Sequence, residues 1–346
     1  MYLILLSRGV EVAVLLTVRY KITRFIKLLS SLAIAFGLFL PNFAQAYTGI
    51  TIVMSAPTES NLEFVDAFKA EVMNAKATHL RVKLIDLSEV EKLVVAENSE
   101  LVIALGVKAM GAASKLKVTT PVLGVFAPLP TFNSQLANSK RQLGNFSAIV
   151  LDQPYSRRFS LIRTIMPEVK NLGMLLGPHS IMEMEDIRET GEDAQFNILQ
   201  ENIRQESELI PHLTTLLEVS DALMAVPDAL VYTRETVQPI LLTSYRYLKP
   251  VFGFSQTYVK AGALAAVYST SKQLAKQAAE IAIKSQQAPG VLPPPQAPKY
   301  FSVAVNYQVA RSLNIPIADE NSIHKKMLGL EKLSPDTLTV TLKSTP

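Results

Sequence analysis

The sequence predicts an α/β protein built from two Rossmann-like lobes with parallel sheets, joined by a multi-crossover hinge. Short apolar runs rich in β-branched residues alternate with helical patterns from residue 49 onward, which is typical of parallel strands linked by helical crossovers. This alternation runs twice in series. The last third of the chain then adds further strands and a helix, so the chain returns to lobes that have already formed. Several crossovers between two lobes favour a hinge.

The first series begins with a strand predicted at Gly49 to Met54 and a helix predicted at Asn61 to Ala75, which carries apolar residues on one face. Three more strands are predicted at Leu80 to Ile85, Leu101 to Leu105 and Val122 to Phe126. Gly106 and Pro128 follow the last two, where glycine and proline interrupt a strand.

The second series begins after Ile149 with a helix predicted at Arg157 to Met166. Strands are predicted at Leu172 to Leu176, Phe196 to Leu199, Ala222 to Val226 and Val251 to Phe254. Helical patterns separate them around Leu209 to Leu217 and Thr233 to Tyr247.

The last third contains a predicted strand, a helix with an Ala/Ile face, a proline-rich connector that we expect to be stiff and extended, and a terminal strand. They span Ala263 to Tyr268, Lys272 to Lys284, Gly290 to Pro298 and Tyr300 to Val305. We therefore assign residues 47–150 with about 269–287 to the first lobe, and residues 151–268 with about 299–318 to the second. Residues 319–346 form a C-terminal tail.

The N-terminal 46 residues have the pattern of a cleavable secretory signal. Lys21, Arg24 and Lys27 precede an apolar run from Leu28 to Leu40, and the small-x-small sequence Ala44-Gln45-Ala46 follows. The apolar run is short for a membrane span. A signal of 46 residues is long, which suggests that translation starts downstream of Met1. An uncleaved N-terminal anchor is the alternative.

Charge and cysteine content restrict the function further. Residues 1–46 hold five of the 34 Lys and Arg and one of the 30 Asp and Glu, so the remainder carries 29 of each. A neutral mature chain offers no basic surface for nucleic acid. The chain has no cysteine, which excludes disulfides, thiol catalysis, zinc-thiolate sites and a lipid anchor on cysteine. The predicted signal segment leads us to expect a periplasmic location for the mature chain.

Catalytic and cofactor signatures are absent from the sequence. The four histidines, at positions 79, 179, 212 and 324, lack metal-ligand spacing, and no nucleophile elbow, P-loop or dinucleotide fingerprint occurs. Glu183 and Glu185 lie in a predominantly charged stretch from Met182 to Glu192, which is typical of a solvated helical face. We expect neither enzyme activity, nor a metal, nor a cofactor.

Ordered short motifs link the second half of the chain to a known family. They are Leu151-Asp152-Gln153-Pro154, Met166-Pro167, Asn171 to Leu175, Val226-Pro227-Asp228, Pro250 to Gly253, Val259 to Leu264, and Val303 to Leu313. In this order and spacing the chain resembles ABC-transporter substrate-binding proteins with the type I periplasmic-binding-protein fold, a group that includes aromatic amino-acid receptors. The similarity spans roughly Gly49 to Ile317.

The resemblance implies a small ligand held by loops at the carboxyl ends of strands, where open α/β sheets present helix N-termini and free amides. The candidate ligand-binding residues in those loops are Ser55, Gly106, Phe126, Asp228, Tyr232, Phe254 and Gln256. Ser55 and Asp228 could instead cap helices, the rings could be core packing, and Gln256 could be a solvated amide.

The family often has polar side chains where this chain has Phe126-Ala127-Pro128 and Ala229. With Tyr258 also near a strand end, the loops favour an apolar or aromatic ligand, stacked on rings, or a degenerate site. The resulting hypothesis is a periplasmic solute receptor that serves an inner-membrane ABC permease. A sensory or accessory subunit with the same fold, contacting a membrane sensor, and a scaffold without ligand are the alternatives.

Overall fold

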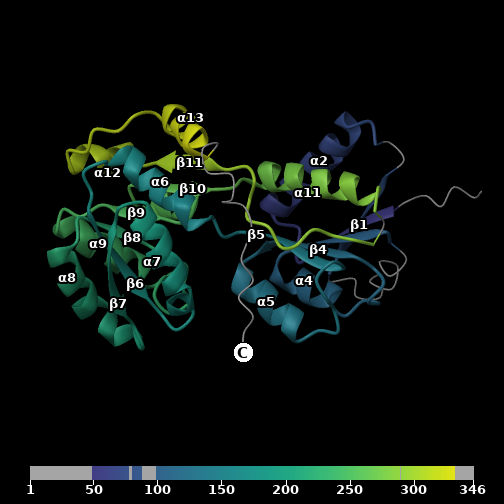
Figure 1. The fold of residues 1–346 in the computed structure, drawn as a ribbon, viewed down its shortest axis with the longest axis horizontal. Helices are drawn as coiled ribbons and strands as arrows, with labels where there is room; N and C mark the ends of the chain where they lie inside the picture. The colour runs from purple at the N-terminus through teal and green to yellow at the C-terminus, as the bar shows by residue number, and fades with distance from the viewer. Residues whose placement is uncertain (1–48, 78–79, 88–98, 289, 332–346) are drawn as a thin grey trace, which may run out of the picture. The chain divides into compact units, whose positions relative to one another are not determined.

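The computed structural model describes residues 49–77, 80–87, 99–288 and 290–331. The predicted signal segment and residues 332–346 of the predicted tail lie outside the described residues. Two sheets, each with helices on both faces, confirm the predicted fold of two Rossmann-like lobes (Figure 1). The first lobe contains the five-stranded sheet, and the second lobe contains the six-stranded sheet.

The first lobe contains a five-stranded parallel sheet in the order β2-β1-β3-β4-β5. Its strands are β1 (Gly49–Met54), β2 (Arg81–Asp86), β3 (Leu101–Leu105), β4 (Val122–Ala127) and β5 (Phe146–Val150). Strand β3 is buried at every residue. This agrees with its unbroken apolar sequence, because a central parallel strand is covered on both faces.

Helices cover both faces of the first sheet. One core cluster joins the sheet to α2 (Glu59–Asn74) and α11 (Ser271–Ser285). The other joins it to α4 (Val107–Ala113) and α5 (Leu129–Ala137). Helix α11 begins with a capping box formed by Thr270 and Gln273, which fixes the start of a helix donated by the last third of the chain.

The second lobe contains a six-stranded sheet in the order β11-β10-β9-β8-β6-β7. Its strands are β6 (Asn171–Leu176), β7 (Asn197–Asn202), β8 (Ala222–Met224), β9 (Val251–Gly253), β10 (Ala265–Tyr268) and β11 (Ser302–Val305). All pairs are parallel except β10 with β11, which is antiparallel. The terminal strand therefore pairs at the edge of the sheet in the reverse direction.

Two core clusters also flank the second sheet. One includes α6 (Tyr155–Ile165), α7 (Met184–Asp193), α12 (Tyr307–Ser312) and α13 (Glu320–Glu331). The other includes α8 (Leu209–Val219), α9 (Val237–Arg246) and α10 (Gln256–Ala261). Short 3₁₀ turns, η2 (Ser180–Glu183) and η3 (Glu206–Glu208), precede α7 and α8. Helix α13 shows that the predicted tail is helical as far as Glu331.

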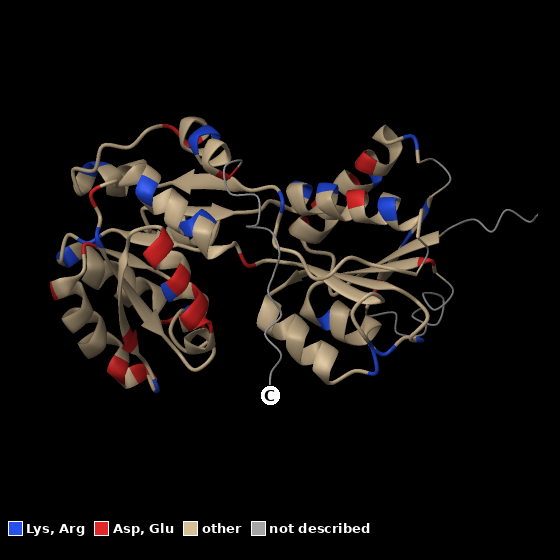
Figure 2. Ribbon diagram, in the orientation of Figure 1, with Lys and Arg blue, Asp and Glu red and all other residues tan. Residues whose placement is uncertain are grey.

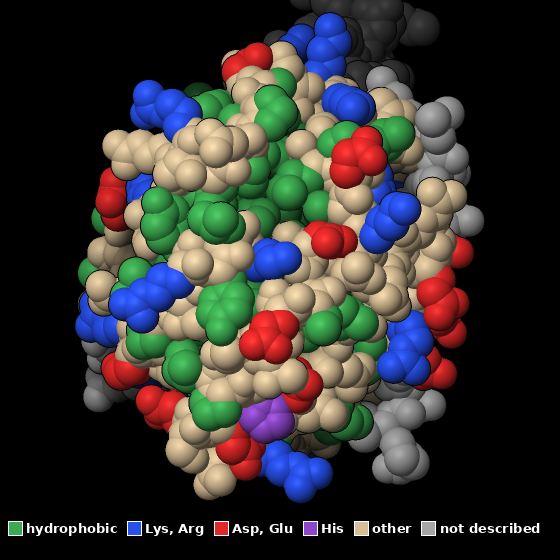
Figure 3. Space-filling model, turned by 90° about the vertical axis from the view of Figure 1, so that its left-hand side faces the viewer, with side chains coloured by type: hydrophobic (Ala, Val, Ile, Leu, Met, Phe, Trp, Pro, Cys, Tyr) green, Lys and Arg blue, Asp and Glu red, His purple; other side chains and the backbone are tan. Residues whose placement is uncertain are grey.

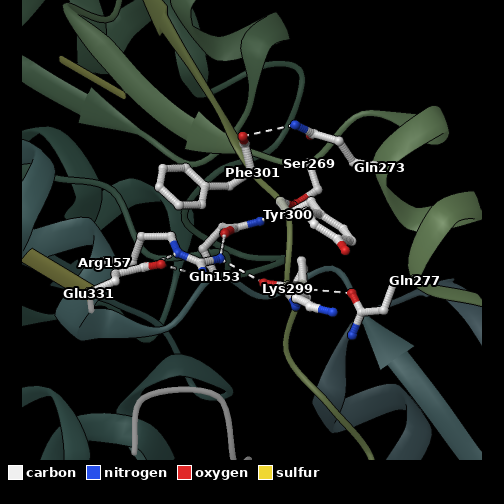
Figure 4. Close-up of polar contacts among 10 residues, drawn as sticks. Gln153, Arg157, Ser269, Gln273, Gln277, Lys299, Tyr300, Phe301 and Glu331 are labelled. Carbon is white, nitrogen blue, oxygen red and sulfur yellow. Dashed lines mark hydrogen bonds and ion pairs between the residues drawn. The ribbon is translucent and has the colours of Figure 1, made fainter. Parts of the chain in front are cut away.

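The chain crosses between the two sheets three times, and hydrogen bonds tie these crossings together (Figure 4). Arg157, which is 1% exposed, donates to the side chain of Gln153 and to the carbonyl of Pro298, each at 2.7 Å, and pairs with Glu331 of α13. Gln153 in turn donates to Ser269 at 2.8 Å. One buried guanidinium thus links the first and third crossings to the C-terminal helix.

Charged side chains of both signs are distributed over the described residues. Figure 2 shows acidic residues gathered along the ribbon of α7, and the exposed acidic residues of that helix are Glu185, Asp186, Glu189, Glu192 and Asp193. On the face of the second lobe shown in Figure 3, Lys and Arg are mixed with Asp and Glu, with hydrophobic side chains between them. No helix in the described part of the chain is long and apolar enough to cross a membrane.

Candidate functional site

The predicted site residues all lie at or just beyond the carboxyl ends of strands. Ser55 follows β1, Gly106 follows β3, and Phe126 is the penultimate residue of β4. In the second lobe the residues come from two loops: Asp228 and Tyr232 after β8, and Phe254 and Gln256 after β9. The structure therefore places three of them in the first lobe and four in the second.

Ser55 and Gly106 form one unit of structure. The Ser55 hydroxyl donates to the Leu105 carbonyl at 3.0 Å and accepts from the Ala109 amide at 3.0 Å. Gly106 is the N-cap of α4 and has no side chain, so Ser55 supplies the cap from a neighbouring strand. A Cβ on Gly106 would lie 2.9 Å from the Ser55 Oγ, and its φ is +91°. The glycine makes room for the serine.

Phe126 lies where the ladder between β4 and β5 shifts register, and it has a left-handed backbone with φ of +60°. This conformation is costly for an aromatic residue. Its ring is partly buried and packs edge-on against Phe64 of α2, with centroids 5.6 Å apart. Strain at a strand end is common at functional sites, and contact between Phe126 and a ligand stays a prediction.

A second helix of the first lobe is also capped from a distance. Pro128 is the N-cap of α5 and offers no side-chain hydrogen bond. Asp152, in the first crossing, accepts from the Leu129 amide at 2.7 Å instead. Burial raises the pKa of Asp152, and the bond from Leu129 opposes that rise. This hydrogen bond from Leu129 to Asp152 therefore joins the first crossing to the start of α5.

Asp228 is almost fully buried and accepts five hydrogen bonds. One oxygen takes the His179 amide at 3.1 Å and both the amide and hydroxyl of Ser180, at 3.0 and 3.1 Å. The other takes the amides of Leu230, at 2.9 Å, and Val231, at 3.4 Å. Burial alone would raise the pKa of Asp228, but these donors lower it below its usual value. Asp228 therefore joins the start of η2 to the turn at Leu230 and Val231. It does not cap α9, which begins at Val237 with Thr236 as its N-cap, and binding of a ligand ammonium stays a prediction.

The structure brings three aromatic side chains together at the carboxyl ends of β8 and β9. Tyr232 contacts Phe254 and Tyr258 edge-on, with both pairs of centroids 5.9 Å apart, and Phe254 lies 5.1 Å from Tyr258. Gly253 leaves room for the Tyr258 ring, because a Cβ there would lie 2.9 Å from it. Phe254 and Tyr232 are only partly buried. The cluster offers ring faces and edges to a planar molecule.

Gln256 lies between Phe254 and Tyr258 in the sequence. It is the exposed first residue of α10, whose N-cap is Ser255 accepting from the Tyr258 amide at 3.2 Å. The position fits a solvated amide as well as a contact to a ligand, so the binding role of Gln256 stays a prediction.

Polar side chains that sequence reasoning missed lie at the same edge of the second sheet. Arg158 of α6 is 6% exposed and donates to the carbonyl of Ala225, directly after β8. Its guanidinium also lies 5.4 Å from the Tyr155 ring centre. The Tyr155 hydroxyl donates to Glu183. Glu183, predicted to lie on a solvated face, is instead partly buried, and burial raises its pKa.

Helical spacing could have identified Arg158. It lies four residues before Ile162 and seven before Ile165, which are both buried in the core, and residues at these spacings share one helix face. An arginine on the apolar face of a helix must therefore be buried or reach a polar partner. The burial of Arg158 was not predicted because it follows Arg157 directly, and two adjacent arginines suggest a solvated turn of the helix.

Titratable side chains and a cavity also lie elsewhere among the described residues, outside the predicted site. No group of three or more His, Asp or Glu side chains among them is arranged to hold a metal ion. His212 pairs with Glu201 on α8 and β7, where both side chains are partly exposed to solvent. A cavity of about 180 Å³ lies between the end of α6 and α13 and is lined by Thr164, Ile165, Ile317, Ile323 and Lys326, among others. None of the predicted residues lines it.

Comparison with known proteins assigns this architecture to a described group. A family model, ABC transporter substrate binding protein, matches residues 40–326. A search of curated proteins finds no match.

Several solved structures share the fold at low identity. An ABC domain in complex with L-Trp, from Streptococcus pneumoniae, is 17% identical with a TM-score of 0.54, covering 81% of this chain and 98% of its own. A ligand-free, open substrate binding protein with adhesive properties, from Clostridium difficile, is 15% identical with a TM-score of 0.64, covering 79% and 96%. A conserved domain protein from Vibrio cholerae is 17% identical with a TM-score of 0.52, covering 81% and 98%.

Proposed function

Because the chain belongs to the ABC transporter substrate binding protein family, we propose that it captures a small planar or aromatic solute between its two lobes and delivers it to a membrane permease. The family assignment supports solute binding rather than catalysis. The solute class and the delivery step are the proposal, and the periplasm is its proposed location.

The aromatic cluster of Tyr232, Phe254 and Tyr258 carries the proposal about the solute. Ligands of open α/β folds bind at the carboxyl ends of strands, and this cluster comes from the segments that follow two adjacent strands, β8 and β9. Partly exposed rings at such an edge gain most from covering a planar, apolar surface. The relative from Streptococcus pneumoniae was solved with L-Trp, which supports the same ligand class here.

The first lobe supports a ligand with a large apolar body. Its strand-end loops present Phe126 and the backbone around Gly106, while Ser55 is bonded within the protein. Closure of two such lobes would bury the solute between ring surfaces, as in other hinged binding proteins. The hinge crossings, held together by Arg157 and Gln153, provide the axis that such closure requires.

The absence of tryptophan from the chain makes a direct test possible. Indole compounds excited at the red edge of their absorption report their own binding, because the 11 tyrosines absorb little there. Fluorescence anisotropy should rise when L-tryptophan binds. Phe254→Ala should weaken that binding about five- to hundred-fold, since one ring contributes roughly 1 to 3 kcal/mol through buried area and stacking.

Tyr245→Ala is the matched control, because Tyr245 is an aromatic residue on α9 that is 44% exposed and outside the cluster. It should leave binding unchanged. A thermal-shift panel of aromatic amino acids, nucleobases, sugars and branched aliphatic acids extends the test to other ligands. A response confined to sugars or aliphatic acids would contradict the aromatic solute while leaving solute binding intact.

A further inference from the structure

Arg158 has an unusual combination of burial and free hydrogen-bonding capacity. Its guanidinium carries five N–H donors, yet within the described part of the chain it donates one hydrogen bond, to the Ala225 carbonyl, and forms no ion pair. The side chain is 6% exposed. A buried cation normally has an anionic partner, because leaving a charge unpaired away from water is costly.

The neighbouring Arg157 and Arg163 of α6 use most of their N–H donors within the protein. Arg163 donates to four backbone carbonyls, those of Pro167, Val169, Ala194 and Gln195, at 2.7 to 3.1 Å. Arg157 has a carboxylate, an amide and a carbonyl as partners. Arg158 donates one hydrogen bond from its five N–H groups, whereas Arg157 and Arg163 each donate four.

Two further donors without acceptors lie at the same edge of the second sheet. The hydroxyls of Tyr232 and Tyr258 are buried and have no hydrogen-bond partner among the described residues, and Tyr258 is 4% exposed. The backbone amides of Leu175 and Val226 lie near the Tyr232 hydroxyl but outside hydrogen-bond geometry. Burial raises the pKa of Tyr232, and the nearby charge of Arg158 opposes that rise. Both phenols therefore stay protonated and able to donate.

The nearby carboxylates do not neutralise Arg158 by direct contact. Asp152 and Glu183 lie close enough to raise the pKa of the Arg158 guanidinium against the lowering caused by burial. Their own hydrogen bonds go elsewhere: Asp152 accepts from Leu129, and Glu183 accepts from Tyr155. Asp228 is occupied by five donors of its own. None of these three carboxylates is hydrogen-bonded to Arg158, so most of its N–H donors are left for another acceptor.

We propose that Arg158 binds the carboxylate of a planar organic acid whose apolar body lies on the cluster of Tyr232, Phe254 and Tyr258. This inference rests on the proposed function, since it names the polar group of the same solute. Arginine suits the role because its planar fork matches a carboxylate in two parallel hydrogen bonds. The phenol of Tyr232 is the neighbouring donor for the same group.

The test compares an acid with its amide of the same shape. Indole-3-acetate and indole-3-acetamide share the indole body, so their fluorescence anisotropy titrations report the contribution of the carboxylate alone. The wild-type chain should bind the acid about 10- to 100-fold more tightly, the range expected for a charge-assisted hydrogen bond. Arg158→Met should reduce this ratio to about one.

Arg163→Met is the matched control, because it removes a partly buried arginine from the same helix and should lower the melting temperature without changing the ratio. If Arg158→Met does not fold, Arg158→Lys replaces it. The lysine keeps the charge but loses the fork, and the ratio should fall to an intermediate value.

The outcomes separate this inference from the proposed function. Equal binding of acid and amide by the wild-type chain overturns the role of Arg158 and leaves the aromatic solute standing. A ratio that Arg158→Met, or Arg158→Lys in its place, leaves unchanged also overturns it. A response to nucleobases alone overturns the role of Arg158 and leaves the planar solute standing. Failure of both indole compounds and of L-tryptophan to bind, with no thermal shift from any aromatic amino acid or nucleobase, overturns the two proposals together.

Discussion

At the strand ends of the first lobe, polar side chains are bonded to the protein itself, whereas at those of the second lobe several buried donors have no partner. Ser55 caps α4 and Asp152 caps α5, in each case for an N-cap residue that cannot do so, Gly106 or Pro128. In the second lobe, Arg158 and the phenols of Tyr232 and Tyr258 keep free donors.

This difference between the lobes suggests a different role for each in binding the solute. Hydrogen-bonding groups used for caps position the backbone of the first lobe and leave Phe126 as its contact surface. Groups without partners in a buried place have a cost that a ligand can remove. We therefore expect the second lobe to select the solute chemically and the first lobe to cover it.

Asp228 is the exception within the second lobe, and replacing it should have the largest effect on stability. Asp228→Asn removes the charge from five hydrogen bonds and replaces one acceptor oxygen by a donor. We expect the free energy of unfolding to fall by about 2 to 3 kcal/mol, measured by urea unfolding. Affinity of the folded variant should hold. A selective loss of affinity for amines would show instead that Asp228 binds the solute.

The pH dependence of stability provides a second measure of the same carboxylate. The folded-state pKa of Asp228 is depressed by its donors, so its contribution is fully present above the unfolded pKa of about 3.9 and is lost as pH falls through the folded value. The stability difference between wild type and Asp228→Asn should therefore shrink below about pH 4.

Burial raises the pKa values of Asp152 and Glu183. Their protonation on acidification therefore removes two buried charges and stabilises the folded state, which is opposite to the effect of protonating Asp228. Both wild type and Asp228→Asn contain Asp152 and Glu183, so subtracting their free energies of unfolding at each pH removes this contribution. A difference that stays constant down to low pH would contradict the role of the charge of Asp228.

Ser55→Ala should have a smaller effect on stability than Asp228→Asn, and it tests the first lobe directly. Loss of the cap on α4 should lower the free energy of unfolding by about 1 kcal/mol. Thr58→Ala is the comparison, because Thr58 caps α2 of the same lobe through the Asn61 amide at 3.3 Å. If Ser55→Ala instead weakened solute binding at unchanged stability, the contrast between the lobes would fail.

Much of the fold could be predicted because its central strands are unbroken apolar runs. Strands β1 and β3 have the predicted bounds, since burial on both faces requires such sequences. Strand β5, with sequence FSAIV, was missed at the point where the second series was expected to begin. Helices α4 and α5 were missed because Gly111 and Pro130 interrupt short segments whose remaining residues show little periodicity.

The site could be predicted only in part, because position along the chain does not show which partners a side chain has. The strand-end rule located Tyr232 and Phe254 correctly relative to each other. Whether the Ser55 hydroxyl is free depends on the Ala109 amide, 54 residues away. The burial of Arg158 depends on the strand that ends before Ala225.

The interleaved path of the chain has a consequence for the order of synthesis. Helix α11, which covers the first sheet, is made only after most of the second lobe, and β11 and α13 complete the second sheet and its core later still. Domains made from continuous segments can fold in turn as they emerge. Here neither lobe can acquire its full core until residues near 285 and 327 have been translated. Both lobes therefore reach their native packing at nearly the same time, late in translation or after it.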